Sequence, residues 1–200
     1  MKEKLKIAVI DNYDSFVYNL IRYLKEEGET EINIMRNDKI DFSILDKVDG
    51  VLLSPGPGIP SEAGELNSVI SKYHQTKNIL GVCLGHQAIA EFFGSKLEKC
   101  LTPIHGEASE IEIIGENQLF ENFPTKIQVG RYHSWKVENK ANSELDFTAF
   151  TKENEIMAFQ HKKLPIYGVQ FHPESILTPF GRKIIKNWLK EIETKTKISL

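Results

Sequence analysis

Short apolar runs divide the first half of the chain at regular intervals. Residues 5–11 (LKIAVID), 50–53 and 78–82 are continuous apolar stretches, which are typical of strands buried on both faces of a sheet. Residues 31–35 are interpreted as a further strand. Polar or Gly/Pro-containing segments follow these runs, so the sequence predicts several short, separate strands.

Segments with helical spacing lie between these strands. From Ser15, apolar residues recur at helical spacing up to Gly28, a typical residue to follow a helix, and residues 66–73 have a similar pattern. The resulting β-α-β-α order with short connections predicts parallel strands joined by right-handed crossovers. We therefore expect an α/β fold with a mostly parallel central sheet and helices on both faces, and ligand binding at the carboxyl ends of the strands.

The pattern changes after Gly94. The following segments are shorter, more polar and rich in β-forming residues: 109–114, 126–132, 146–151 and 155–160. They predict a mixed sheet or a small additional antiparallel β region. Residues 165–171 then form another apolar run that ends at His172, and residues 179–192 have the pattern of a last amphipathic helix.

The composition is that of an ordinary globular domain, and we expect a single domain over residues 1–200 with a frayed tail from 193 to 200. The chain is 40% hydrophobic, 10% aromatic and 26% charged, with a net charge of −3. Its Lys and Arg residues are scattered, which argues against a nucleic-acid partner. No apolar run approaches the roughly 20 residues that span a bilayer, and no secretory signal is visible. We expect no membrane association and a cytoplasmic location.

Cofactor and metal chemistry are not indicated by the sequence. Cys83 and Cys100 are the two cysteines, and neither lies in a CxxC motif. The six histidines have spacings that match no metal motif. Residues 54–58 (SPGPG) differ from the GxGxxG pattern of dinucleotide sites. We therefore expect reduced thiols, no cofactor and no bound metal.

Cys83 lies where the strand at 78–82 must turn into a helix, in the segment GVCLGHQ. Gly81 and Gly85 permit a sharp turn that exposes the side chain at its tip. A helix N-terminus favours the thiolate over the thiol, and backbone N–H groups of the turn can face a developing oxyanion. The alternative is a buried small residue at a strand end, which is the usual environment of a free cysteine.

His172 and Glu174 stand at the end of a buried strand, in the segment GVQFHPES. Residues two apart in extended backbone point to the same side, so Glu174 can orient His172 while His172 serves Cys83 as base and acid. Each of these residues alone could be an ordinary loop or surface residue. Their joint position at strand ends of one parallel sheet favours a nucleophile, a base and an orienting carboxylate.

Together these segments resemble the class I, or triad-type, glutamine amidotransferase family, through the motifs GVCLGHQ and GVQFHPES. Residues 11–16 (DNYDSF), 54–58 (SPGPG) and 131–134 (RYHS) are similar to the glutaminase subunits of anthranilate synthase and aminodeoxychorismate synthase. The resemblance extends from Ile7 to about Leu189 and implies a flavodoxin-like fold.

The resemblance implies hydrolysis of L-glutamine through a thioester on Cys83, with His172 and Glu174 as its catalytic partners. Ammonia would pass to a chorismate-binding synthase subunit. The resemblance also assigns the backbone N–H groups of Gly56 and Leu84 to the oxyanion. It assigns the following residues to the glutamine: Gly56, Pro57, Gly58, Gln87, Ser134 and Trp135.

Contacts with the synthase subunit are implied for Asn12, Tyr13 and the loop at 105–106. Two residues depart from the family pattern. Glu107 stands where many relatives have Lys or Arg, which reverses a charge near the implied interface, and Trp135 stands where Leu is more usual. A contact made through backbone atoms tolerates the second change.

Two other functions remain open at this point. One is a free-standing cysteine hydrolase or peptidase of similar architecture, which would use the same thiol and imidazole. The other is a regulatory module that keeps the fold without the activity, which the intact Cys83, His172 and Glu174 disfavour. The sequence does not separate the anthranilate role from the aminodeoxychorismate role.

Overall fold

The computed structural model describes residues 4–138 and 143–198. Its strands are β1 (Leu5–Asp11), β2 (Thr30–Arg36), β3 (Gly50–Leu53), β4 (Asn78–Val82), β5 (Leu97–Lys99), β6 (Glu107–Ile113), β7 (Lys126–Arg131), β8 (Trp135–Val137), β9 (Leu145–Thr151), β10 (Ile156–His161) and β11 (Ile166–Val169). Its helices are α1 (Val17–Glu27), α2 (Phe42–Leu45), α3 (Leu66–Tyr73), α4 (Leu84–Phe92) and α5 (Gly181–Ile198), with short 3₁₀ turns η1 (Pro60–Glu62) and η2 (Gln118–Phe120).

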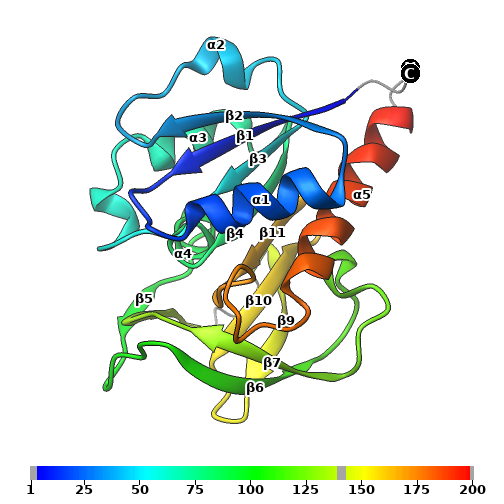
Figure 1. The fold of residues 1–200 in the computed structure, drawn as a ribbon. Helices are drawn as coiled ribbons and strands as arrows, with labels where there is room; N and C mark the ends of the chain where they lie inside the picture. Colours follow the sequence, from blue (N-terminus) through cyan, green and yellow to red (C-terminus); the bar gives the residue numbers. More distant parts are fainter. Residues whose placement is uncertain (1–3, 139–142, 199–200) are drawn as a thin grey trace.

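The central sheet has nine strands in the order β2-β1-β3-β4-β11-β10-β9-β6-β7. Neighbouring strands from β2 to β11 are parallel, whereas β10, β9, β6 and β7 continue the sheet in antiparallel pairs. Figure 1 shows the parallel part in the upper half of the view and β6, β7 and β9 in the lower half. The α/β prediction and the additional β region are therefore confirmed, with β5 and β8 as a separate two-stranded sheet.

The two faces of the parallel sheet are covered by different helices, because alternate residues of a strand point to opposite faces. In β1, Ile7 and Val9 pack in a core that includes side chains of α1 and α5. Ala8 and Ile10, the intervening residues, pack in a second core with side chains of α3 and α4. Strands covered on both faces must be apolar throughout, which explains the continuous runs in the sequence.

The last strand and the last helix differ from their predicted bounds. β11 ends at Val169, two residues before the predicted end, because the backbone N–H of Gln170 already bonds to Met157 and that of His172 to Gly130. α5 continues past residue 192 to Ile198, into the segment for which a frayed tail is predicted. Residues 199–200 of that segment lie outside the described residues.

No helix among residues 4–138 and 143–198 combines the length and the hydrophobicity that crossing a membrane requires.

The packing of α5 gives a first prediction. Trp188 is fully buried between α5 and the sheet, where its ring lies against Gly50. Replacing it in Trp188→Ala should lower the free energy of unfolding by about 3–5 kcal/mol, because the lost contacts leave a cavity. Denaturant titration followed by circular dichroism measures this change. Tyr18→Ala, at a side chain that is 64% exposed on α1, is the control and should change stability by less than about 0.5 kcal/mol. Equal losses in the two variants would contradict the packing described.

Candidate active site

The carboxyl ends of four neighbouring parallel strands define one edge of the sheet. β4 leads into Cys83 and β11 leads toward His172, while β1 and β3 lead into the loops that begin at Asn12 and Ser54. β4 and β11 pair in register, with Val82 opposite Val169. The residues that follow these two strands therefore emerge side by side, which is the usual place for a ligand in such a sheet.

Cys83 has a strained backbone at the turn between β4 and α4. Its φ is 51° and its ψ is −100°, and it occupies the position immediately before the helix. A non-glycine residue in such a region costs about 1–3 kcal/mol, and strain of this kind is typical of functional sites. A Cβ at Gly81 would lie 2.5 Å from the carbonyl carbon of Gly85, and a Cβ at Gly85 would collide with the carbonyl oxygen of Leu53. The turn therefore requires both glycines.

His172 and Glu174 form a buried pair beside this turn. Nδ1 of His172 lies 2.5 Å from Oε1 of Glu174, and both side chains are almost completely buried. The backbone of His172 is held on both sides, because its N–H donates to Gly130 and its carbonyl accepts from the hydroxyl of Thr178. The carboxylate thus holds one ring nitrogen, while Nε2 makes no hydrogen bond within the described part of the chain.

The electrostatics of this pair favour a charged imidazole. Burial alone lowers the pKa of His172, but the negative charges of Cys83 and Glu174 outweigh it, so that this pKa lies well above its ordinary value. A thiolate on Cys83 and an imidazolium on His172 stabilise each other in such a setting. The arrangement can therefore supply a nucleophile and a proton donor at the same point.

Gln170 contacts the thiol and was not singled out in the sequence. Its Nε2 lies 3.6 Å from Sγ of Cys83, and its Oε1 accepts a hydrogen bond of 3.1 Å from Nε2 of Gln87. Gln87 also donates to the carbonyl of Trp135 at 2.8 Å. The signal in the sequence was a polar residue inside an apolar run, two positions before His172, where period-two spacing already pointed toward the site.

The loop at 54–58 lies against the start of α4. A Cβ on Gly56 would lie 2.5 Å from Cβ of Asn12 and 2.9 Å from Cδ2 of Leu84, so only glycine fits. Gly58 has a φ of 75°, and it and Pro57 are exposed. The structure thus brings Gly56 next to Leu84, the residue that follows Cys83.

Asn12 corrects one interpretation from the sequence. It is 1% exposed, and its side chain donates to the carbonyl of Ser54 at 2.7 Å and accepts from Asn37 at 3.1 Å. A contact of Asn12 with a partner subunit is therefore wrong: its amide fastens two loops of the site to each other. Tyr13, the next residue, is 51% exposed.

Ser134 and Trp135 reach the site from the small β5–β8 sheet. The carbonyl of Ser134 accepts from the N–H of Cys100 at 2.8 Å, and that of Trp135 accepts from Gln87. The six residues expected around the glutamine therefore come from three segments: the loop after β3, the first turn of α4, and the start of β8.

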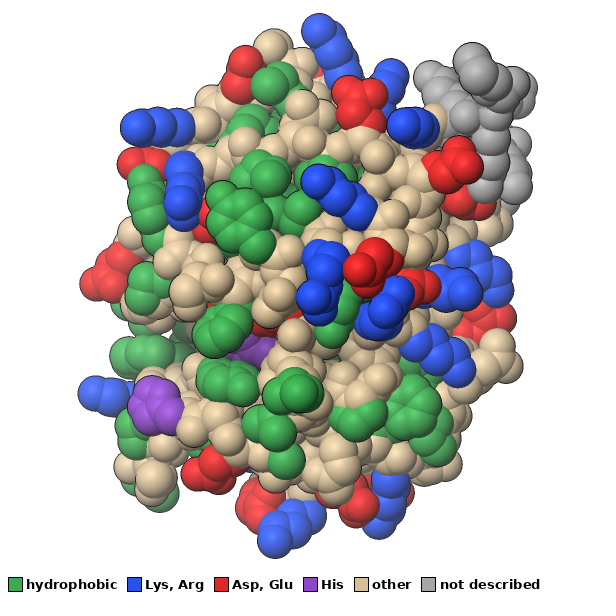
Figure 2. Space-filling model, in the orientation of Figure 1, with side chains coloured by type: hydrophobic (Ala, Val, Ile, Leu, Met, Phe, Trp, Pro, Cys, Tyr) green, Lys and Arg blue, Asp and Glu red, His purple; other side chains and the backbone are tan. Residues whose placement is uncertain are grey.

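A groove of about 340 Å³ adjoins His172 and Glu174. Its other lining residues are Phe16, Asn19, Arg22, Tyr23, Tyr132, Ser175 and Ile176. Figure 2 shows a hollow between the upper and lower parts of the molecule, with hydrophobic side chains around it and a histidine visible inside. The charged side chains on this face are of both signs and are dispersed.

The His172–Glu174 pair gives a second prediction. In Glu174→Gln the pKa of His172 should fall, because the imidazolium loses a carboxylate while its burial remains. NMR titration of the histidine ring signals measures this pKa. Because the folded-state pKa is raised, the pair's contribution to stability is present below about pH 6.5 and is lost as the pH rises through the folded-state pKa. Glu62→Gln, at a carboxylate beside Gly58, should leave the His172 signal unchanged; an unchanged signal in Glu174→Gln would contradict the assignment.

The chain is similar to known proteins over nearly its whole length. Residues 8–192 match the family model for class-I glutamine amidotransferases. The chain is 44% identical over 187 residues to the aminodeoxychorismate/anthranilate synthase component 2 of Bacillus subtilis, covering 92% of this chain and 95% of that one. It is 40% identical over 189 residues to anthranilate synthase component 2 of Lactococcus lactis, covering 93% and 94%.

A solved structure from Thermoplasma acidophilum, of a protein assigned to a GMP synthase, superposes with a TM-score of 0.89 at 31% identity. It covers 100% of this chain and 99% of that one. A glutamine amidotransferase from Thermotoga maritima has the same fold, with a TM-score of 0.68 at 17% identity over 98% and 86% of the two chains. With the strand-to-helix cysteine and the buried His172–Glu174 pair at one sheet edge, these similarities show that the chain belongs to the class-I glutamine amidotransferases.

Proposed function

We propose that this chain hydrolyses the side-chain amide of L-glutamine and delivers the ammonia to a chorismate-binding synthase subunit. The observation that carries the proposal is the strained Cys83 beside the buried His172–Glu174 pair. Family membership supports the amide of glutamine as the substrate, in preference to a peptide or to a purely regulatory role. The names of the relatives from B. subtilis and L. lactis support a chorismate-using acceptor.

In the proposed reaction, the thiolate of Cys83 attacks the amide carbon of glutamine. The oxyanion that forms is stabilised by the backbone N–H groups of Gly56 and Leu84. His172 then gives its proton to the departing nitrogen, so that ammonia leaves and a γ-glutamyl thioester remains on Cys83. His172, now neutral, takes a proton from water as the water attacks the thioester, and glutamate is released with the thiolate restored.

Glu174 orients His172 and stabilises its charged form, and Gln170 and Gln87 link the thiol to the glutamine-binding segments. In the proposal, the substrate is held by Gly56, Pro57, Gly58, Gln87, Ser134 and Trp135. The backbone atoms of Ser134 and Trp135 make their contacts, so the unusual Trp135 is compatible with glutamine binding.

Ammonia is a nucleophile only when it is not protonated, so it must reach the acceptor without equilibrating with water. We place the synthase subunit over the groove beside His172, where Phe16 is half exposed and Ile176 is 93% exposed. The loop at 105–106 lies against Tyr132, which lines the same groove. Tyr13, His105 and Glu107 would then lie at the edge of the interface, and the complex would function in the cytoplasm.

The similarity to the T. acidophilum protein favours a second acceptor for the same ammonia, since that protein is assigned to a GMP synthase. Both proposals share the glutaminase step and differ only in the partner. Co-purification of the chain from its native cell, followed by identification of the bound synthase, separates them. A chorismate-binding partner supports the first proposal, and a nucleotide-binding partner would overturn it.

A third prediction tests the nucleophile. Cys83→Ser should reduce glutamine-dependent product formation by the reconstituted complex by roughly 10³-fold or more, because a serine hydroxyl at this position lacks the reactivity of the thiolate. Synthesis from added ammonia should continue, since the synthase that accepts it is intact. The measurement compares the two nitrogen sources with the same preparation.

Two controls sharpen this test. Cys100→Ser, at the other cysteine, should leave glutamine-dependent synthesis within about twofold of the original chain, which is within the range of a change outside the site. Loss of ammonia-dependent synthesis in Cys83→Ser would indicate a damaged complex. Undiminished glutamine-dependent synthesis in Cys83→Ser would disprove the proposed chemistry, and cleavage of peptides by the isolated chain would favour the free-standing hydrolase.

A fourth prediction tests the docking surface. Ile176→Asp should weaken binding to the chorismate-binding synthase by at least about tenfold, because it buries a charge in an apolar contact. Sedimentation or calorimetry measures the affinity. Ile114→Asp is the matched control, since Ile114 is also an exposed isoleucine but lies outside the groove. Equal affinities of the two variants would place the interface elsewhere.

A further inference from the structure

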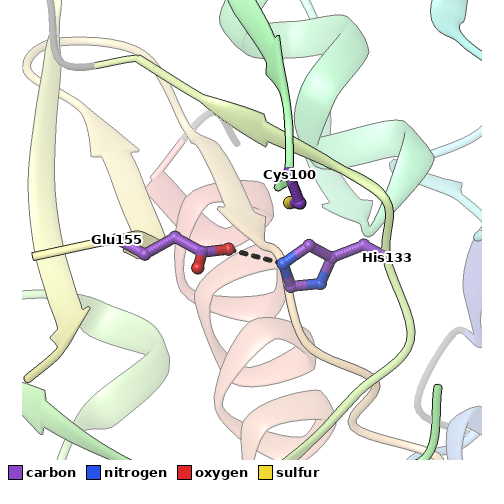
Figure 3. Close-up of side chains that lie close together, drawn as sticks. All are labelled: Cys100, His133 and Glu155. Atoms are coloured by element: carbon purple, nitrogen blue, oxygen red, sulfur yellow. Dashed lines mark hydrogen bonds and ion pairs between the residues drawn. The ribbon is translucent and has the colours of Figure 1, made fainter. Parts of the chain in front are cut away.

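Cys100, His133 and Glu155 gather in a second cluster beside the glutamine-binding segment. The three residues follow β5, precede β8 and precede β10, respectively, and Figure 3 shows their side chains converging. One ligand atom from each lies within 4.8 Å of the others. Nε2 of His133 is 2.5 Å from Oε1 of Glu155. The residues are far apart in sequence, so their spacing predicted no metal site.

A thiolate, an imidazole and a carboxylate form a ligand set suited to zinc, which accepts sulfur, nitrogen and oxygen donors in tetrahedral geometry. We propose that Cys100, His133 and Glu155 bind one Zn²⁺ ion, whose fourth position is occupied by water. This assignment overturns the prediction of no metal in the chain. Cys100 is partly exposed, which gives the ion and the water a path from solvent.

The contact between His133 and Glu155 marks where the ion enters. Zinc bonds of about 2.0–2.1 Å at a tetrahedral angle need the two atoms about 3.3 Å apart, so the present 2.5 Å separation must widen by less than about 1 Å. The other carboxylate oxygen, Oε2, is bonded to Arg131 and can keep that bond. A ligand carboxylate held by a second group in this way is usual in metal sites.

The charges and protons of the cluster are consistent with an entering dication. Burial opposes the charge of Glu155, yet His133 and Arg131 lower its pKa to about 2, so it is a carboxylate at neutral pH. Burial lowers the pKa of His133, which keeps the ring neutral. Burial and the nearby Glu155 raise the pKa of Cys100, so its thiol must release one proton when the metal binds.

The proton on Nε2 of His133 can move to Nδ1, which has no hydrogen-bond partner among the described residues. Arg131 opposes a cation, since its guanidinium lies 3.4 Å from Nε2 of His133. The thiolate and the carboxylate together outweigh that single positive charge. Glu98 and Lys136, which pair with each other nearby, contribute no net charge.

Such an ion would fasten the ribbon that carries Ser134. The N–H of Cys100 already holds the carbonyl of Ser134 at 2.8 Å, and Ser134 directly follows His133. A metal joining the two flanking side chains to Glu155 would therefore fix this segment to β10. This consequence concerns structure and does not depend on the proposed glutaminase activity.

The fifth prediction is tested in a Cys83→Ser background, because Cys83, His172 and Glu174 are themselves possible zinc ligands. With Cys83 replaced, Cys100 is the one remaining cysteine of the chain. Calorimetry should then detect one Zn²⁺ per chain, and added Co²⁺ should give a thiolate-to-cobalt charge-transfer absorption. Adding Cys100→Ala should abolish that absorption and weaken Zn²⁺ binding at least about tenfold. No Zn²⁺ binding, no such absorption, or equal affinity in the two proteins would overturn the proposal.

Glu155→Gln and Glu98→Gln form a matched pair in the same background. Glu155→Gln should weaken Zn²⁺ binding at least about tenfold, whereas Glu98→Gln, at a nearby carboxylate paired with Lys136, should change it by less than about twofold. Circular dichroism confirms that each variant is folded. Equal effects of the two replacements would mean that the carboxylate of Glu155 is not a ligand. If Glu155→Gln does not fold, the comparison of the Cys83→Ser proteins with and without Cys100 still decides the proposal.

Discussion

The pairing of β4 with β11 is the constraint on which the site depends. These strands are parallel and in register, with Gly81 opposite Gly168 and Val82 opposite Val169, so both chains leave the sheet at the same height. The bond from the N–H of Cys83 to the carbonyl of Val169 extends this pairing to the nucleophile itself. A slip in register would move Cys83 along the edge relative to His172 and would also turn the side chains of β11 to the wrong faces.

The strained turn at Cys83 is tolerated because rigid neighbours surround it. Gly81 packs on Gly85, and Gly85 packs on the backbone of Leu53, so β3, β4 and the start of α4 approach more closely than any side chain would permit. Burial of β3 and β4 on both faces holds this contact in place. The stability of the apolar sheet thus maintains a backbone conformation that Cys83 would not adopt in isolation.

The sequence predicted the parallel half well, because strands covered on both faces must be apolar throughout. The bounds of β1, β3, β4 and α3 agree residue for residue with the predicted ranges. β5 and β8 were missed, since each has three residues that are mostly not buried and therefore show no regular alternation. Gln170 was missed as a contact of Cys83, and the role of Asn12 was misjudged, because both depend on which loops meet in space.

The two clusters of Cys, His and Glu show that residue types alone do not determine chemistry. In the first, Glu174 holds Nδ1 of His172 and leaves Nε2 without a hydrogen bond in the described structure, so the imidazole can exchange a proton with Cys83. In the second, Glu155 occupies Nε2 of His133, and Arg131 binds the same carboxylate. The nitrogen that could act as a base toward Cys100 is therefore already engaged. The second cluster is thus unsuited to proton transfer, whereas a cation that replaces the shared proton can use all three ligands at once.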